Sequence, residues 1–184
     1  ETGSGVRMVQ PGSVDGASTD DASTNDAVAF WATGVGAGEL RAETVEEPGP
    51  GQVLVRTRWT GVSRGTEALV MRGQVPESEH ERMRAPFQSG GFGFPLKYGY
   101  LMKGVVESGP SPLLGKTVFT LFPHQSQFVV DAGAVSVVPD AVAARRAVLA
   151  GAVETAHNVL WDARPALGDR ITVIGAGMIG CSIA

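Results

Sequence analysis

Residues 170–184 at the C-terminal end constrain the fold more than any other part of the chain. The β-branched run 171–174 is typical of a strand that is buried on both faces of a parallel sheet. Gly175, Gly177 and Gly180 follow at once in a G-x-G-x-x-G pattern, and residues 178–184 have the composition of a helix start. A strand, these glycines and a helix in this order predict the first unit of a dinucleotide-binding fold.

Each glycine has a separate physical role in such a unit. Gly175 permits a tight turn, Gly177 lets the backbone approach a pyrophosphate, and Gly180 lets the helix pack closely on the strand. The phosphates then lie on the free N–H groups at the helix start, so we predict that NAD or NADP contacts Gly175, Gly177, Met178, Ile179 and Gly180. The alternative is a glycine-rich turn in an unrelated α/β unit.

The chain ends before the rest of such a domain. The acidic residue that binds the ribose is expected about 20 residues further on, beyond Ala184, so NAD cannot be distinguished from NADP. The chain also begins with Glu1 instead of methionine. We therefore expect it to be a piece of a longer protein.

Charge is concentrated at the N-terminal end. The net charge is −4, and residues 1–26 account for all of it with five acidic residues and one basic residue. This segment is small and polar, so we predict that 1–26 is a disordered acidic N-terminal segment. The remaining chain is formally neutral and offers no basic surface, which excludes nucleic acid and anionic lipid as expected partners.

Targeting and redox signals are few. No apolar run reaches the length needed to cross a membrane, and 27–37 lacks the basic flank of a signal peptide. We therefore expect a cytoplasmic protein with a small-molecule substrate. Cys181 is the single cysteine, which excludes an internal disulfide and a four-cysteine zinc site.

Short strands fill the middle of the chain, and a helical period follows them. A helical patch is expected to about Arg72, an irregular loop over 73–97, and a helix over 144–161 with Gly151 as a possible break. Strands are expected at 52–59, 98–107, 116–121, 126–130 and 135–138.

Six stretches of this chain, in this order, resemble the medium-chain dehydrogenase/reductase superfamily. They are 48–55, 61–67, 98–106, 127–130, 138–140 and 167–180. The resemblance is to the bacterial branch often labelled zinc-binding alcohol dehydrogenase. It implies a mainly β GroES-like catalytic domain at 27–140. Residues 141–184 would then form a helical link and the first β-turn-α of a Rossmann domain that is C-terminally incomplete.

The chain departs from this family at the zinc ligands. The resemblance places a cysteine where this chain has Ser63, a histidine where it has Tyr100, and a third ligand near Glu154. Hydroxyl groups are poor substitutes for thiolate and imidazole, so we expect no zinc. The alternative is a rearranged zinc site that uses Glu154, His157 and His124.

Without a metal, side-chain hydroxyls must handle the proton of the reaction. Tyr100 is our candidate donor, with Ser63 or Thr66 as a relay. The alternative is that Tyr100 only packs its ring in a strand. Arg64 either contacts a cofactor phosphate, as the resemblance implies, or is an exposed loop residue.

Four further residues have two interpretations each. Glu67 either orients its neighbours or caps the short helix that follows it. His124 faces the substrate or lies in a surface loop. Glu154 and His157 are three residues apart on a predicted helix, and a packed or hydrogen-bonded pair near the cofactor is the simpler interpretation than a metal site.

The resemblance implies an NAD(P)-dependent oxidoreductase that transfers hydride between nicotinamide and an alcohol/carbonyl or enone/quinone substrate. It also implies a homodimer or homotetramer of the full-length protein. We expect this piece alone to lack dehydrogenase activity. The alternatives are a dinucleotide-binding protein without turnover and a zinc-dependent alcohol dehydrogenase with a rearranged site.

Overall fold

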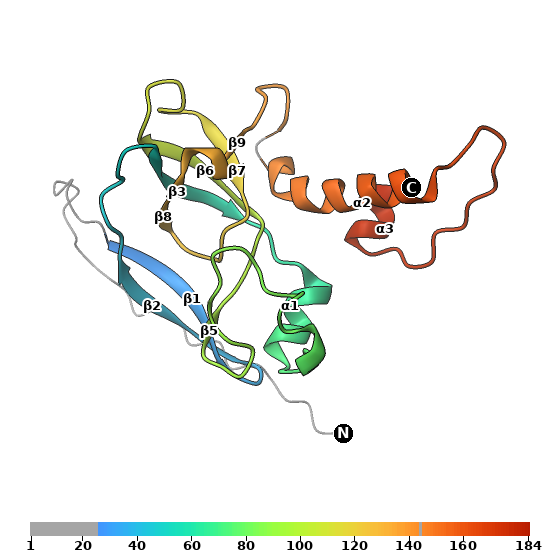
Figure 1. The fold of residues 1–184 in the computed structure, drawn as a ribbon, viewed down its shortest axis with the longest axis horizontal. Coiled ribbons are helices and arrows are strands. Elements are labelled where there is room, and N and C mark those ends of the chain that lie inside the picture. The colour runs from blue at the N-terminus through green and yellow to red at the C-terminus, as the bar shows by residue number, and fades with distance from the viewer. Residues whose placement is uncertain (1–25, 144) are drawn as a thin grey trace.

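The computed structural model describes residues 26–143 and 145–184 (Figure 1). Two antiparallel sheets form the body of the molecule, and two helices extend from one side of it. The segment 1–26, predicted to be disordered, lies outside the described residues except for Asp26, which begins the first strand.

A four-stranded sheet in the order β2-β1-β5-β4 forms one part of the body. Strands β1 (Asp26–Gly34) and β2 (Ala37–Thr44) make a hairpin. Strands β4 (Ser89–Gly90) and β5 (Leu96–Lys97) lie within the loop expected over 73–97, so that loop contributes to the sheet.

A five-stranded sheet in the order β8-β3-β6-β7-β9 forms the other part. Its strands match the five predicted strands, with ends shifted by a few residues. They are β3 (Gln52–Thr60), β6 (Met102–Ser108), β7 (Thr117–Thr120), β8 (Gln127–Asp131) and β9 (Ser136–Val137).

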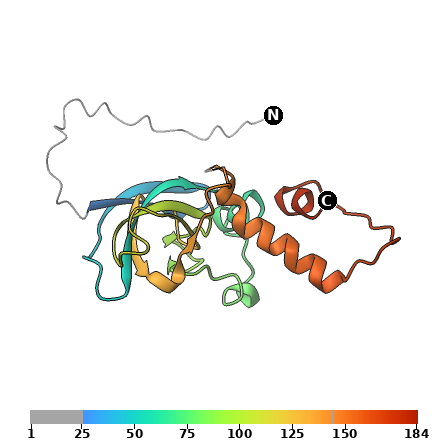
Figure 2. The same ribbon diagram turned by 90° about the horizontal axis from the view of Figure 1, so that it is seen from above.

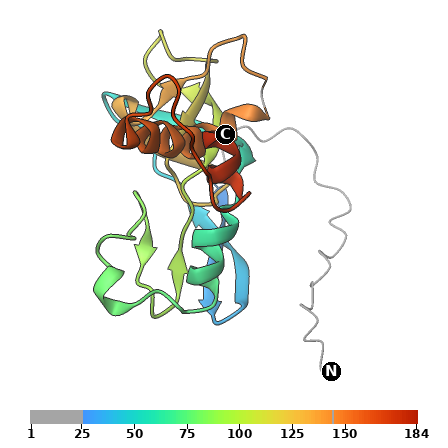
Figure 3. The same cartoon turned by 90° about the vertical axis from the view of Figure 1, so that its right-hand side faces the viewer.

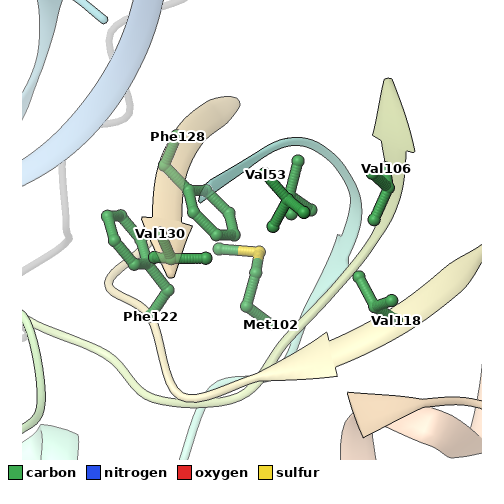
Figure 4. Close-up of a cluster of buried hydrophobic side chains, with 8 residues drawn as sticks. Val53, Met102, Val106, Val118, Phe122, Phe128 and Val130 are labelled. Carbon is green, nitrogen blue, oxygen red and sulfur yellow. The ribbon is translucent and has the colours of Figure 1, made fainter. Parts of the chain in front are cut away.

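The inward side chains of this sheet form the larger hydrophobic core (Figure 4). The rings of Phe122 and Phe128 stack with centroids 3.9 Å apart, and Met102 is fully buried. Alternation along the strands explains the pattern, because every second residue of a strand faces the same side. The other members of the core are Val53, Val55, Val106, Val118 and Val130.

Residues 124–126 join the two sheets. The backbone N–H of Phe30 in β1 donates to the carbonyl of His124, and the N–H of Thr57 in β3 donates to the carbonyl of Ser126. Helix α1 (Arg64–Met71) lies beside the β1–β2 hairpin in Figure 3. With the turn η1 (Glu77–Glu79), the loop that follows α1 covers a second, smaller core.

After β8 the chain passes through the turn η2 (Ala132–Ala134) and β9, and the link that follows contains the turn η3 (Arg146–Leu149). Helix α2 (Ala150–Ala163) starts six residues later than the helix predicted over 144–161, because η3 occupies the first part of that range. Helix α3 (Met178–Ile183) packs on α2. Figure 2 shows both helices projecting from the body.

Residues 171–174, predicted to be a buried strand, form no strand in the structure. Ile171 is 59% exposed and Ile174 is 96% exposed. A strand exists only through hydrogen bonds to a neighbour, and within the described residues no other strand lies beside this segment. No described helix has both the length and the apolar character needed to cross a membrane.

Candidate active site

Glu67 anchors a hydrogen-bonded site at the start of α1. Ser63 precedes the helix in an extended conformation, and its backbone N–H donates to Glu67 Oε1 at 2.7 Å. The carboxylate thereby satisfies one of the free N–H groups at the helix start. Its other oxygen, Oε2, lies 2.7 Å from His124 Nε2. Both interpretations of Glu67 from the sequence therefore hold, because it caps the helix and orients a neighbour.

His124 is the centre of the site. Its Nδ1 lies 2.5 Å from Thr60 Oγ1, at the end of β3. The side chains of His124 and Glu67 are 12% and 11% exposed, whereas Thr60 is exposed. The imidazole thus lies between a sheltered carboxylate and an accessible hydroxyl. The structure therefore contradicts the interpretation of His124 as an exposed surface-loop residue.

The fold makes room for this imidazole at Gly99. This residue has φ +128°, in the region that favours glycine, and a Cβ there would lie 2.9 Å from the His124 ring. The His124 backbone is held on both sides, since its N–H donates to the Tyr98 carbonyl and its own carbonyl accepts from Phe30. The ring therefore has one position available.

Two tyrosines flank the site. Tyr98 is buried, and its hydroxyl donates to the Met83 carbonyl at 2.9 Å. Burial, with smaller contributions from Tyr100 and Glu67, raises the pKa of Tyr98 to about 12. Tyr98, Glu67 and His124 line a cavity of about 30 Å³, which has room for a water molecule. Tyr100 is half-buried, with its ring edge-on to Tyr98 at 6.1 Å.

The other residues predicted for the site lie along α1. Ser63 is buried at the helix start and Thr66 is half-buried in the first turn. Arg64 is the first helical residue and is exposed. Sequence reasoning missed Thr60, because nothing in the pattern of β3 distinguishes it from the strand residues before it.

Glu154 and His157 lie elsewhere, on the exposed surface of α2. The His157 ring packs against Trp161 at 4.3 Å, and Glu154 borders a groove of about 470 Å³ between the sheet edge and the link. Within the described residues, no three His, Cys, Asp or Glu side chains are placed to hold a metal ion. The hydroxyls of Ser63 and Tyr100 do not fit catalytic zinc.

The glycine loop has the geometry predicted for a phosphate cradle. Gly175 has φ +102°, as the tight turn requires, and a Cβ at Gly180 would overlap the Gly175 carbonyl oxygen. A Cβ at Gly177 would meet no atom within 4 Å, so the loop is open at that point. The residues present therefore fit the pyrophosphate of a dinucleotide.

Comparison with known proteins finds similar folds and one partial sequence relative, although no family model matches the chain. A 2-desacetyl-2-hydroxyethyl bacteriochlorophyllide A dehydrogenase from Cereibacter sphaeroides is 38% identical over 78 residues, which are 41% of this chain and 21% of that protein. An alcohol dehydrogenase superfamily protein from Novosphingobium aromaticivorans is 25% identical with a TM-score of 0.63. It matches 85% of this chain and 48% of its own.

A quinone oxidoreductase from Thermus thermophilus, solved also with NADPH, has a TM-score of 0.60 at 21% identity, over 85% of this chain and 48% of that one. The chain has the fold of the medium-chain dehydrogenase/reductase superfamily. It spans about half the length of these superfamily structures. The expected fold class, a mainly β domain followed by a helical link, is confirmed, although the strand of the expected β-turn-α unit is not formed over 171–174.

Proposed function

We propose that the chain is part of an NAD(P)-dependent oxidoreductase that acts on an alcohol/carbonyl or an enone/quinone substrate. The observation that carries this proposal is the junction of a superfamily barrel with a link that ends in an open glycine loop. A relative named as a dehydrogenase and a similar structure solved with NADPH support it. On this proposal 27–140 is the catalytic domain, and 141–184 is the link and the start of the dinucleotide-binding domain.

Different residues of the chain would contact different parts of the dinucleotide. The open backbone at Gly177 would approach the pyrophosphate, with Gly175 and Gly180 shaping the loop. Arg64 is exposed at the start of α1 and would contact a phosphate. The nicotinamide, when bound, supplies or accepts the hydride, and the protein positions it and handles the proton.

The reaction also requires a proton transfer. On this proposal the chain performs it without the thiolate and imidazole ligands of zinc-dependent members of the superfamily. Tyr100 is a candidate donor, with Ser63 or Thr66 at the start of α1 as a relay. Tyr98 is a poor base, because burial raises its pKa to about 12 and its hydroxyl is already bonded to the Met83 carbonyl.

Binding and turnover, measured separately, test the proposal. Binding of NADH and NADPH is measured by titration calorimetry on the purified full-length protein. Oxidation of each nucleotide is followed by its nicotinamide absorbance with benzaldehyde, cyclohexenone and 1,4-benzoquinone as substrates. We expect binding of one nicotinamide nucleotide and turnover of at least one compound. Binding without turnover favours a regulatory or structural protein, and absence of binding contradicts the proposal.

Metal content distinguishes the remaining alternative. The metal-replete protein is analysed by mass spectrometry alongside the binding assay. We expect far less than one zinc per chain, because Ser63 and Tyr100 stand where the zinc enzymes have thiolate and imidazole. About one zinc per chain would instead support a rearranged site with Glu154, His157 or His124 as ligands.

A further inference from the structure

Three side chains that are distant in sequence form one continuous hydrogen-bonded chain. Thr60 comes from the end of β3, Glu67 from α1, and His124 from the segment that joins the two sheets. The Thr60 hydroxyl is the exposed end of this chain and Glu67 is the sheltered end. A proton can therefore move between an accessible oxygen and a protected imidazole.

The hydrogen bonds determine which imidazole nitrogen holds a proton. A carboxylate can only accept, so His124 Nε2–H donates to Glu67 Oε2. Glu67 is held in turn by the Ser63 N–H, which fixes the orientation of the acceptor. In the neutral imidazole, Nδ1 is then an acceptor for the Thr60 hydroxyl; in the imidazolium, Nδ1–H donates to Thr60 Oγ1. Both protonation states keep both hydrogen bonds.

Thr60, the exposed end of this hydrogen-bonded series, lies at the end of β3 beside the link to the glycine loop. Trp59 precedes Thr60, and the guanidinium of Arg145 lies over its ring at 5.0 Å. Gly61 follows Thr60, and a Cβ there would lie 3.5 Å from Val148 Cβ. The backbone on both sides of Thr60 therefore lies close to the segment that leads to the glycine loop.

We propose that Thr60, His124 and Glu67 form a proton relay whose Thr60 hydroxyl exchanges a proton with the substrate oxygen. The inference rests on the proposed function. A bound nicotinamide would supply the hydride to the carbonyl carbon when a carbonyl is reduced, and the Thr60 hydroxyl gives its proton to the carbonyl oxygen. The Nδ1 proton of the imidazolium then replaces the lost Thr60 proton, which leaves a neutral imidazole. Alcohol oxidation runs these transfers in reverse.

Each residue thus has a distinct role. Thr60 is the catalytic residue, because its oxygen touches the substrate. His124 stores the proton, and Glu67 is a positioning residue that fixes Nε2–H and stabilises the imidazolium. The ionisable side chains that line the cavity beside His124 are Glu67 from α1 and Tyr98 from the segment before β6. Burial raises the pKa of Tyr98 to about 12, so its phenol keeps its proton near neutral pH.

Substitution of Thr60 is the first test, since an exposed strand end tolerates change. Thr60→Val removes the hydroxyl at nearly constant shape and is expected to lower kcat for benzaldehyde reduction about 100-fold or more, with KM within about threefold. Thr60→Ser keeps the hydroxyl and is expected to restore most of the rate. Thr44→Val, at the exposed end of β2, is the matched control.

The pH profile separates a relay from a structural role. Carbonyl reduction consumes the proton that the relay supplies, so kcat/KM for the wild type is expected to have a limb that falls as pH rises. His124→Gln is expected to flatten this limb, while the control Thr44→Val leaves it in place. A wild-type rate in Thr60→Val, or an unchanged limb in His124→Gln, would overturn the relay and leave the proposed function intact.

A spectroscopic test needs no turnover. The chain has three histidines, so long-range ¹H–¹⁵N spectra of the labelled protein can be assigned with His124→Gln. We expect neutral His124 to carry its proton on Nε2, and Thr60→Val to shift the Nδ1 resonance. A proton on Nδ1 overturns the relay. Failure to bind or oxidise either nucleotide overturns the proposed function instead, and the tautomer is read independently.

Discussion

At the scale of single residues, Gly99 is the position on which the placement of His124 depends. Gly99→Ala combines a strained positive φ with overlap against the imidazole, whose ring lies 2.9 Å from the added Cβ. Such backbone strain alone costs about 1–3 kcal/mol. We expect urea unfolding to give a lower free energy of unfolding by at least that amount, and the NMR signal of His124 to move.

Gly91→Ala is the matched control for this substitution. Gly91 lies in the same region of the chain, and a Cβ there would meet no atom within 4 Å. It is expected to change the free energy of unfolding by less than about 1 kcal/mol. Equal effects of the two alanine variants would show that the site does not depend on Gly99.

Tyr98 provides a pH-dependent test of the same region. Its pKa is about 12 in the folded protein and 10.0 ordinarily, so between these values the unfolded chain loses the phenol proton and the folded chain keeps it. Stability therefore falls as pH rises through this range, by about 2–3 kcal/mol in total. We expect the free energy of unfolding of Tyr98→Phe, measured by denaturant titration, to fall less steeply than that of the wild type from pH 10 to 12. Parallel curves would contradict burial of the phenol.

The sequence predicted Glu67 and the need for a proton donor, but it did not predict how the site is assembled. Residues 60, 67 and 124 lie on different elements, and no local pattern relates them. His124 was a candidate from the sequence, but its position beside Glu67 and Thr60 follows from the fold, in which 124–126 joins the two sheets. The glycine loop was predictable because its residues are contiguous and its glycines are required by the local backbone conformation and packing.

At the scale of elements, a buried ion pair ties the β1–β2 hairpin to β5. Lys97 Nζ lies 2.6 Å from Glu43 Oε2 and 2.7 Å from Gln125 Oε1, and Glu43 also accepts the Trp31 indole N–H. The Lys97 side chain is only 9% exposed. Removing one partner would leave a carboxylate partly buried without its cation, which costs far more than loss of a surface pair.

Lys97→Met is therefore expected to lower the free energy of unfolding by about 3 kcal/mol in urea titration. Arg56→Met is the matched control, because Arg56 and Glu107 form an ion pair of the same 2.6 Å length with side chains 46% and 32% exposed. Its expected effect is below about 1 kcal/mol. If both variants lose the same stability, burial does not determine the strength of the Lys97 pair.

Element boundaries show where local sequence stops being informative. The five strands of the larger sheet were predicted from alternation and apolar runs, and four of them, β3, β6, β7 and β8, have one face in the core. The strands β4 and β5, two residues each, were not, since they exist only through pairing with β1 and with each other. The helical period over 144–161 did not distinguish the 3₁₀ turn η3 from α2, because both present apolar residues at similar spacing.

At the scale of the whole molecule, the body and the glycine loop differ in how much they bury. Buried residues are dense in both sheets, whereas after Gly151 only Ala152 and Ala156 are buried among the described residues. Trp161 is 66% exposed and Ile174 is 96% exposed. Segments with few buried contacts open at low free energy, so the loop depends on its ligand or on further contacts for order.

Amide hydrogen exchange can test this difference together with the proposed cofactor site. Peptides from 164–184 are expected to exchange quickly and those from β3 and β6 slowly. If Gly177 approaches a pyrophosphate, NADPH should slow exchange at 175–180 selectively. Gly180→Ala should abolish that protection, because its Cβ would overlap the Gly175 carbonyl oxygen, while Gly133→Ala, at an open position in η2, should preserve it. Protection by NADPH that survives in Gly180→Ala would place the nucleotide outside the glycine loop.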